Sequence, residues 1–192
     1  MAEIKPIDWQ AADGACLVLR SAQPRDARGL ITLTRRVLAS ATHMVQEVAE
    51  YDIAPRGEKN WILRQQDNPN GLYLVAQAQD GALVGMLDCR GEPRWRRRHA
   101  VTLGLAIDPD WQGRGMGRAL MHRALDWARR HPGIERVELH VHAGNAPALA
   151  LYRQLGFLEE GRRLRAIKYR DGRYCDDLLM CAFVGAGNAD IA

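Results

Sequence analysis

The segment from Asp108 to Arg118 constrains this chain most, because it places three glycines between an apolar strand and an amphipathic helix. Glycines at positions 113, 115 and 117 allow a turn with positive φ and a close approach of the backbone to a ligand. The free N–H groups of the helix's first turn, and the positive end of its dipole, point at the same place. A diphosphate suits such a cradle, and Arg114 and Arg118 add positive charge.

Two better-known phosphate loops do not fit this segment. The dinucleotide-binding fingerprint Gly-x-Gly-x-x-Gly needs a third glycine at position 118, where Arg118 stands. The phosphate loop of the ATPases needs Gly-Lys-Ser/Thr at the start of the helix, and that triplet is absent from this segment. A flexible strand–helix turn with incidental arginines remains as the alternative.

Length and composition indicate a globular chain. The 192 residues suit one domain, and 47% hydrophobic with 26% charged residues is the balance of a soluble protein. No apolar run approaches the roughly 20 residues that a membrane-spanning helix needs. The N-terminus lacks the apolar core of a secretory signal. The four cysteines form no Cys-x-x-Cys pair, so we expect reduced thiols in a cytoplasmic protein.

The charge is mildly basic, with a formal net charge of +4. Such a balance fits an anionic ligand or a nucleic acid without requiring either. Five arginines stand between Arg90 and Arg98, around Trp95. This loop has the residues to stack a nucleobase and meet phosphates, but its plainer interpretation is a solvated loop that borders an acceptor groove. No helix-turn-helix, zinc or aromatic-strand signature accompanies it, so we predict no nucleic-acid partner and no membrane association.

Hydrophobic periodicity and turn residues predict an ordered series of elements. Strands are expected over Cys16–Ser21, Leu72–Ala78, Ala82–Cys89, His99–Ile107, Val137–Val141, Leu164–Tyr169 and Asp177–Val184, and helices from Pro24, over Glu58–Gln66, after the glycines and from Asn145 to Leu155. This order predicts one α/β domain with a mixed sheet and helices on both faces. We place the domain at residues 15–184, between a flexible N-terminal extension, 1–14, and a flexible tail, 185–192.

A resemblance to a known family rests first on Gln112-Gly113-Arg114-Gly115-Met116-Gly117. These six residues match the Gln/Arg-x-x-Gly-x-Gly/Ala signature of the GNAT superfamily of N-acetyltransferases. The preceding strand, with Leu105-Ala106-Ile107, resembles the family's fourth strand. The resemblance implies that backbone N–H groups of the loop, with Arg118 beside them, hold the pyrophosphate of coenzyme A. It also implies that the strand's backbone pairs with the pantetheine arm.

Asn145 and Tyr152, followed by Gly156-Phe157, form a second pattern. Residues seven apart share one face of a helix. Taken alone, Asn145 is also a good helix cap and Tyr152 a good core tyrosine. The spacing resembles the GNAT pattern, which implies that Asn145 contacts the cofactor. The same resemblance implies that Tyr152 lies near the thioester sulfur, and Tyr152 is our candidate general acid.

No general base is identified by the sequence. His99 and Thr102 lie on the strand that leads to the thioester, and His140 and His142 share a face of the next strand. A base acting through water, or no base, fits equally well. The histidine pair has no third ligand nearby in the sequence, so we predict no metal.

The resemblance covers the order of elements from Leu17 to Val184 and implies a mixed, mostly antiparallel twisted sheet of about seven strands. It implies transfer of an acetyl group from acetyl-coenzyme A to a primary amine of a small molecule, such as an amino acid, a polyamine or an antibiotic. Glu47, Glu50 and Tyr51 stand where the family often sets acceptor specificity. The alternatives are a protein N-terminus or lysine as the acceptor, and a non-catalytic domain that senses acyl-coenzyme A. A homodimer is possible on family resemblance alone.

Overall fold

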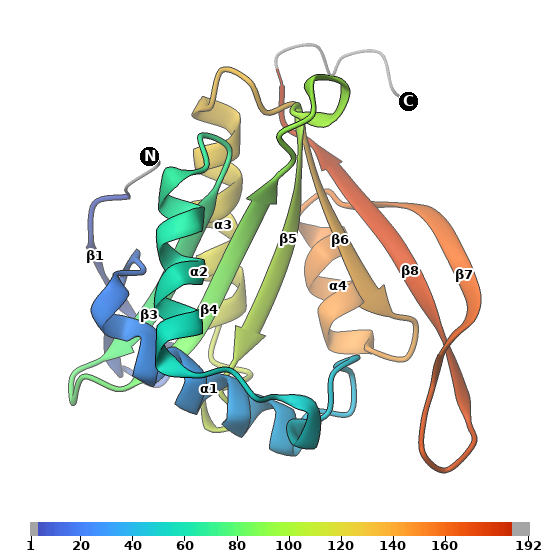
Figure 1. Ribbon diagram of the computed structural model, residues 1–192, viewed down its shortest axis with the longest axis horizontal. Coiled ribbons are helices and arrows are strands. Elements are labelled where there is room, and N and C mark those ends of the chain that lie inside the picture. Colours follow the sequence, from blue (N-terminus) through green and yellow to red (C-terminus); the bar gives the residue numbers. More distant parts are fainter. Residues whose placement is uncertain (1–3, 186–192) are drawn as a thin grey trace.

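The computed structural model describes residues 4–185, and within them one sheet of eight strands is present (Figure 1). The strands are β1 (Ile7–Gln10), β2 (Cys16–Ser21), β3 (Leu72–Ala78), β4 (Leu83–Gly91), β5 (Ala100–Ile107), β6 (Arg136–His142), β7 (Leu158–Lys168) and β8 (Tyr174–Phe183). Their order across the sheet is β1-β2-β3-β4-β5-β6-β8-β7. Only β5 and β6 pair in parallel among the described strands, and the other pairs are antiparallel.

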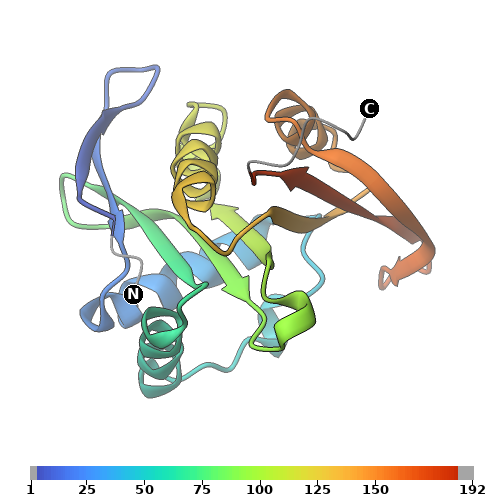
Figure 2. The same ribbon diagram turned by 90° about the horizontal axis from the view of Figure 1, so that it is seen from above.

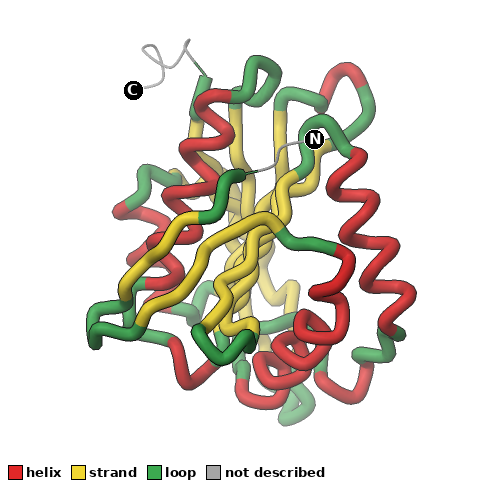
Figure 3. The backbone as a smooth tube through the Cα atoms, turned by 90° about the vertical axis from the view of Figure 1, so that its left-hand side faces the viewer, coloured by secondary structure: helices red, strands yellow, loops and turns green. Residues whose placement is uncertain are grey.

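Helices cover both faces of this sheet, which Figures 2 and 3 show as a central layer between two helical layers. The helices are α1 (Ala27–Ser40), α2 (Pro55–Asp67), α3 (Met116–Arg130) and α4 (Ala146–Gln154), and the 3₁₀ turns are η1 (Pro24–Asp26), η2 (Val48–Glu50), η3 (Trp95–Arg97) and η4 (Pro109–Trp111). α1 and α2 lie on one face, and α3 and α4 lie on the other (Figure 2). None of the described helices is long and apolar enough to cross a membrane.

Alternation along the strands supplies a separate apolar core to each helical layer. Val101 and Leu103 of β5 and Val137 and Leu139 of β6 are buried in the cluster that includes the inner faces of α3 and α4. The neighbouring residue Ala106 belongs to the second cluster, with apolar residues of α1 and α2. The two faces of β5 and β6 are therefore distinct, and each side chain can be assigned to one of them.

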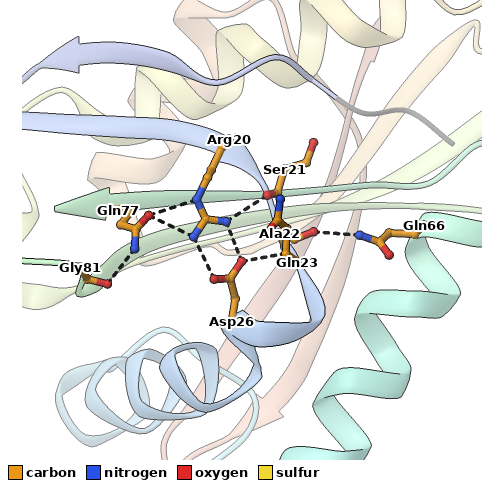
Figure 4. A network of polar contacts seen from close by, with 8 residues as sticks. All are labelled: Arg20, Ser21, Ala22, Gln23, Asp26, Gln66, Gln77 and Gly81. Carbon is orange, nitrogen blue, oxygen red and sulfur yellow. Dashed lines mark hydrogen bonds and ion pairs between the residues drawn. The ribbon is translucent and has the colours of Figure 1, made fainter. Parts of the chain in front are cut away.

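A buried ion pair fixes the start of α1 against β2 (Figure 4). The guanidinium of Arg20 donates two hydrogen bonds to the carboxylate of Asp26, at 2.6 and 2.8 Å. Gln77 of β3 accepts from the same guanidinium, and the backbone N–H of Gln23 donates to Asp26 at 2.7 Å. Burial alone would raise the pKa of Asp26, but the hydrogen bonds from Arg20 and Gln23 hold that pKa below its ordinary value.

The predicted elements are present, and two parts of the sheet differ from expectation. Strand β1 lies within residues 1–14, which we expected to be a flexible extension. Ile7 and Trp9 pair with β2 and pack on the core, but a four-residue alternation is too short to stand out in a sequence. Strand β7 begins at Leu158, not at Leu164 as predicted. The prediction missed its first residues because the side chains of β7 are almost all polar and exposed, as is common at a sheet edge. Residues 186–192 of the expected tail lie outside the described residues.

Candidate active site

The two central parallel strands, β5 and β6, separate along their length. They pair only at their first residues, where Ala100, Val101 and Thr102 face Arg136, Val137 and Glu138. Beyond this seam the strands diverge toward their carboxyl ends (Figure 1). β5 keeps its pairing with β4 down to Ile107, so one edge of β5 is left without a strand partner on the β6 side. Ligands of open α/β sheets bind outside such carboxyl ends.

Backbone groups of alternate β5 residues point into this split. The carbonyl of His99 accepts from the backbone of residues 135 and 136, so it faces β6, whereas the N–H of Asp108 donates to Val84 of β4. Backbone groups of successive strand residues point to opposite edges of the strand. The N–H and C=O groups of Leu105 and Ile107 therefore point in the same direction as the carbonyl of His99, toward the split. The same alternation turns the backbone of Ala106 toward β4. Of the three strand residues predicted to pair with the cofactor, Leu105 and Ile107 therefore face the split, although the carbonyl of Ile107 accepts from the side chain of Gln112.

The glycine-rich turn follows β5 and leads into α3. Gly113 and Gly115 have φ of 74° and 87°, and a side chain at position 113 would contact nothing within 4 Å. Gly115 is the N-cap of α3, so no side chain occupies the N–H groups of the first turn, which includes Met116. Gly117, expected to share the positive φ, lies instead inside the helix. A side chain there would contact Leu151 of α4 at 3.4 Å.

Three contacts fix this turn, and none of them was predicted from the sequence. Asp108 is fully buried and accepts hydrogen bonds from Arg36 of α1 and from the backbone N–H of Asp110. Gln112 donates to the carbonyl of Ile107 at 3.2 Å. The remaining contact is that of Arg114, which pairs with Asp13 in the β1–β2 turn at 2.6 Å and stacks over Trp111. Asp13 and Arg36 are distant in sequence from the loop, so no local pattern indicated them.

Asn145 and Arg118 mark the two helix starts beside the split. The parallel direction of β5 and β6 places the N-termini of α3 and α4 at the same edge of the sheet. The side-chain oxygen of Asn145 accepts from the backbone N–H of Ala148 at 3.3 Å, so Asn145 is a helix cap, as its residue type predicts. Arg118 of α3 donates to Gln154 of α4. Asn145 thus caps its own helix, and Arg118 connects α3 with α4. A role of either side chain in holding the cofactor remains a prediction.

Tyr152 lies on α4 and is buried against Phe157, with ring centroids 5.8 Å apart. Burial raises the pKa of Tyr152 to about 12. The phenol is consequently protonated at neutral pH, which a general acid requires.

A pocket of about 840 Å³ lies past the end of β6, where Gly144 lines it. One wall is the end of α1 with the loop after it, and the other is the β7–β8 turn. Of the three residues predicted to contact the acceptor, only Glu47 lines this pocket. Glu50 accepts from the backbone N–H of Glu47, and Tyr51 is buried. Glu47 also pairs with Arg170 of the opposite wall at 2.6 Å, so an ion pair spans the pocket.

The histidines occupy three different environments. His99 lies at the seam, at the end of β5 remote from the glycine turn. His142 is buried next to His43, and His43 lines the pocket. The Nδ1 atom of His142 lies 3.3 Å from the hydroxyl of Tyr169. Burial lowers the pKa of His142, and the neighbouring His43 lowers it further. His140 is half-exposed, with Nδ1 2.8 Å from the buried carboxylate of Asp177.

The arginine-rich loop lies away from this site. Turn η3, with Trp95, precedes β5 and so stands at the opposite end of the sheet from the glycine turn (Figure 1). Arg98 stacks on the exposed Trp95 at 3.3 Å from the ring centroid, and Arg97 pairs with Glu138. This loop does not line the pocket between α1 and the β7–β8 turn, and its place beside an acceptor groove remains a prediction.

Comparison with known proteins adds sequence and fold relationships. A family model described as "Acetyltransferase (GNAT) family" matches residues 40–157. The L-amino acid N-acetyltransferase AaaT of Escherichia coli K12 is 35% identical over 120 residues, which make up 62% of this chain and 73% of that protein. Other curated relatives are longer, and the chain spans less than half of several of them.

Solved structures agree with these matches. A GNAT-family acetyltransferase from Streptococcus pneumoniae has a TM-score of 0.84 at 26% identity, with 88% of this chain and 99% of that chain covered. An acetyltransferase from Salmonella typhimurium, solved with its cofactor acetyl-CoA, has a TM-score of 0.78 at 20% identity and shares the fold, over 92% and 98% of the two chains. The predicted fold class is confirmed. The chain belongs to the GNAT family of acetyltransferases.

Proposed function

We propose that this protein transfers an acetyl group from acetyl-CoA to the primary amine of a small molecule, by direct attack of the amine on the thioester. The observation that carries the proposal is the split between β5 and β6, with the glycine turn at its edge. An extended pantetheine arm fits an unpaired strand edge, and a pyrophosphate fits a helix N-terminus without a side-chain cap.

The residues present fit acetyl-CoA. The backbone groups of Leu105 and Ile107 face the split, and the turn at Gly113 leaves open space where a side chain would stand. The first N–H groups of α3 are free of side-chain acceptors. Acetyl-CoA, when bound, supplies an acetyl thioester, whose carbonyl is the electrophile. The N–H groups of Leu105 and Ile107 are the candidates to stabilise the charge that develops on the carbonyl oxygen.

The acceptor amine must be neutral to attack. At pH 7 an amine of pKa about 10.4 needs roughly 4.6 kcal/mol to lose its proton, whereas an α-amine of pKa about 8 needs only about 1.4 kcal/mol. Proton removal is thus a larger part of the barrier for a lysine-like amine. A thiolate of pKa about 8.5 leaves more easily when a nearby donor protonates it. Tyr152 is the candidate donor, since its hydroxyl stays protonated well above neutral pH.

The pocket between α1 and the β7–β8 turn is the proposed acceptor site. Its walls carry both signs of charge, with Glu47 and Asp171 beside Arg170 and Arg173. An amino acid presents an ammonium and a carboxylate, so such a pocket suits it. The relative AaaT acts on L-amino acids according to its name, and this favours the same acceptor class here.

An acceptor screen tests this function. Purified protein is mixed with acetyl-CoA and single amines, and free thiol is measured. We expect turnover with at least one L-amino acid above the rate without an amine. Turnover only with peptides would favour a protein N-terminus or a lysine as the acceptor. No amine-dependent thiol release, combined with tight acetyl-CoA binding, would favour a sensor and overturn the proposal.

A further inference from the structure

Strand β5 carries no ionisable side chain along the split. Its residues from Ala100 to Ile107 are apolar apart from Thr102. A side chain that accepts the proton of the attacking amine therefore belongs to another element. The strand across the split, β6, carries three such groups on one face, namely Glu138, His140 and His142.

These three side chains point to the face where the acceptor pocket lies. Glu138 pairs in register with Thr102, and the intervening residues Val137 and Leu139 are buried on the opposite face with α3 and α4. Glu138, His140 and His142 accordingly project toward the α1 side. The acceptor pocket is formed by the end of α1, the loop after it and the β7–β8 turn, and these three side chains lie on the same face without being among its lining residues. Gly104 and His140 each lie two residues beyond the last pair of the seam, so they face one another across the start of the split.

Two of the three groups are already engaged. Glu138 is in contact with Arg136 at 2.9 Å and with Arg97 at 3.5 Å, and its side chain is only 16% exposed. His142 is 4% exposed, and its Nε2 is enclosed without a hydrogen-bond partner among the described residues. An enclosed ring cannot reach an amine that enters from solvent.

His140 has the geometry that the others lack. Its side chain is 45% exposed, and its Nδ1 lies 2.8 Å from Oδ2 of Asp177. Asp177 is buried on β8, and Arg163 of β7 donates to the same carboxylate. The guanidinium of Arg163 lies 3.5 Å from the same Nδ1, farther than the carboxylate. The closer carboxylate favours the tautomer that has its proton on Nδ1, which leaves the lone pair of Nε2 available. No described residue bonds to that Nε2.

We propose that His140, oriented by Asp177, is the general base that accepts the proton of the acceptor amine. The inference rests on the proposed acetyl transfer. As the amine nitrogen bonds to the acetyl carbon, its N–H proton passes to Nε2 of His140. The carbon–sulfur bond then breaks, and the thiolate takes the hydroxyl proton of Tyr152. His140 afterwards releases a proton to solvent, and Tyr152 regains one. Asp177 is a positioning residue, because it acts through His140.

The test compares His140→Gln with His122→Gln, the same change at an exposed histidine of α3 on the opposite face of the sheet. General-base catalysis typically contributes about 10²–10⁴-fold, so we expect kcat of the His140 variant to fall about 100-fold or more. The His122 variant should keep the wild-type kcat. Both should bind acetyl-CoA like the wild type by calorimetry. An unchanged kcat in His140→Gln would overturn the assignment.

Two further readouts separate chemistry from structure. Added imidazole should restore part of the kcat of His140→Ala, because the half-exposed side chain leaves an accessible space. Adding Asp177→Asn to His140→Gln should lower kcat no further, since residues that act as one unit are not additive. Absence of rescue, or a further loss in the double variant, would contradict the proposed pair.

Failure of the inference is distinguishable from failure of the proposed function. The wild type is assayed first with the amine that gives the highest thiol release. Without amine-dependent release by the wild type, acetyl transfer itself is wrong. With a fully active wild type and an equally active His140 variant, only the assignment of the base is wrong.

Discussion

At the scale of the residue, Tyr152 is the sharpest test of the chemistry. Its burial against Phe157 keeps the phenol protonated, with a pKa of about 12. Tyr152→Phe preserves the packing and removes only the hydroxyl. Because a general acid contributes about 10²–10⁴-fold, we expect kcat to fall by about 100-fold or more while the Kd for acetyl-CoA stays within about twofold. Steady-state kinetics and calorimetry measure the two quantities.

A matched control is Tyr73→Phe, which removes the hydroxyl of another buried tyrosine. Tyr73 lies on β3, and its hydroxyl is 3.2 Å from Glu58. This variant should lose stability, because it leaves the buried Glu58 without its partner, but it should keep kcat. Equal losses of turnover in both variants would mean that Tyr152 acts through packing alone.

The buried pair of Arg20 and Asp26 allows a prediction about stability and pH. Removing one partner of a buried ion pair costs about 3–5 kcal/mol, so Asp26→Asn should lower the free energy of unfolding by about that amount at pH 7. The pKa of Asp26 is lowered in the folded state, so its contribution is present above the unfolded pKa of about 3.9. That contribution disappears as pH falls through the lower folded value.

Urea unfolding of wild type and Asp26→Asn at several pH values measures this contribution. The difference between the two proteins should shrink once pH drops below about 4. Asp126→Asn is the control, because Asp126 pairs with Arg129 on the exposed surface of α3. It should change the free energy of unfolding by less than about 1 kcal/mol. A pH-independent loss in Asp26→Asn would contradict the electrostatic account.

At the scale of the element, the glycine turn determines where α3 begins. Gly115 has a φ of 87°, which a β-branched residue adopts only with strain. Gly115→Val should shift the first N–H groups of α3, and we expect the Kd for acetyl-CoA to rise at least about tenfold, or about 1.4 kcal/mol. Calorimetric titration measures this change.

Gly81→Val separates cofactor binding from general strain. Gly81 has a φ of 88° in the β3–β4 hairpin, so the backbone penalty is nearly the same. Both variants should lose similar stability, about 1–3 kcal/mol, but only the Gly115 variant should bind acetyl-CoA more weakly. Equal affinities would show that the turn does not hold the cofactor.

Elements were predictable where burial leaves a period in the sequence. β3 has the bounds predicted from its apolar run and the Asp80-Gly81 turn, and Asn145 and Gly156 begin and end α4 as their residue types indicate. The range predicted for β7 was too short, because an edge strand with polar side chains on both faces has no apolar period. The contacts that fix the glycine turn were not predictable, since Asp13 and Arg114 are 101 residues apart.

At the scale of the whole molecule, the sheet consists of two parts joined at a short seam. The antiparallel strands β1 to β5 form one part, and β6 to β8 form the other, with three residue pairs between β5 and β6. Local patterns predicted both strands, but their divergence depends on packing between distant elements. The family resemblance implied only that the backbone of one strand pairs with the pantetheine arm. A ligand in the split would link the two parts of the sheet by pairing with the backbone groups of β5 that have no strand partner.

Hydrogen exchange tests this arrangement residue by residue. Binding of acetyl-CoA should slow exchange of the amides of Leu105 and Ile107, which face the split. The amide of Ala106 already faces β4, so its exchange should change little beyond the general stabilisation of the fold. Amides of β3, between β2 and β4, report that general effect. Equal slowing at all these positions would mean that the cofactor stabilises the protein without pairing with β5.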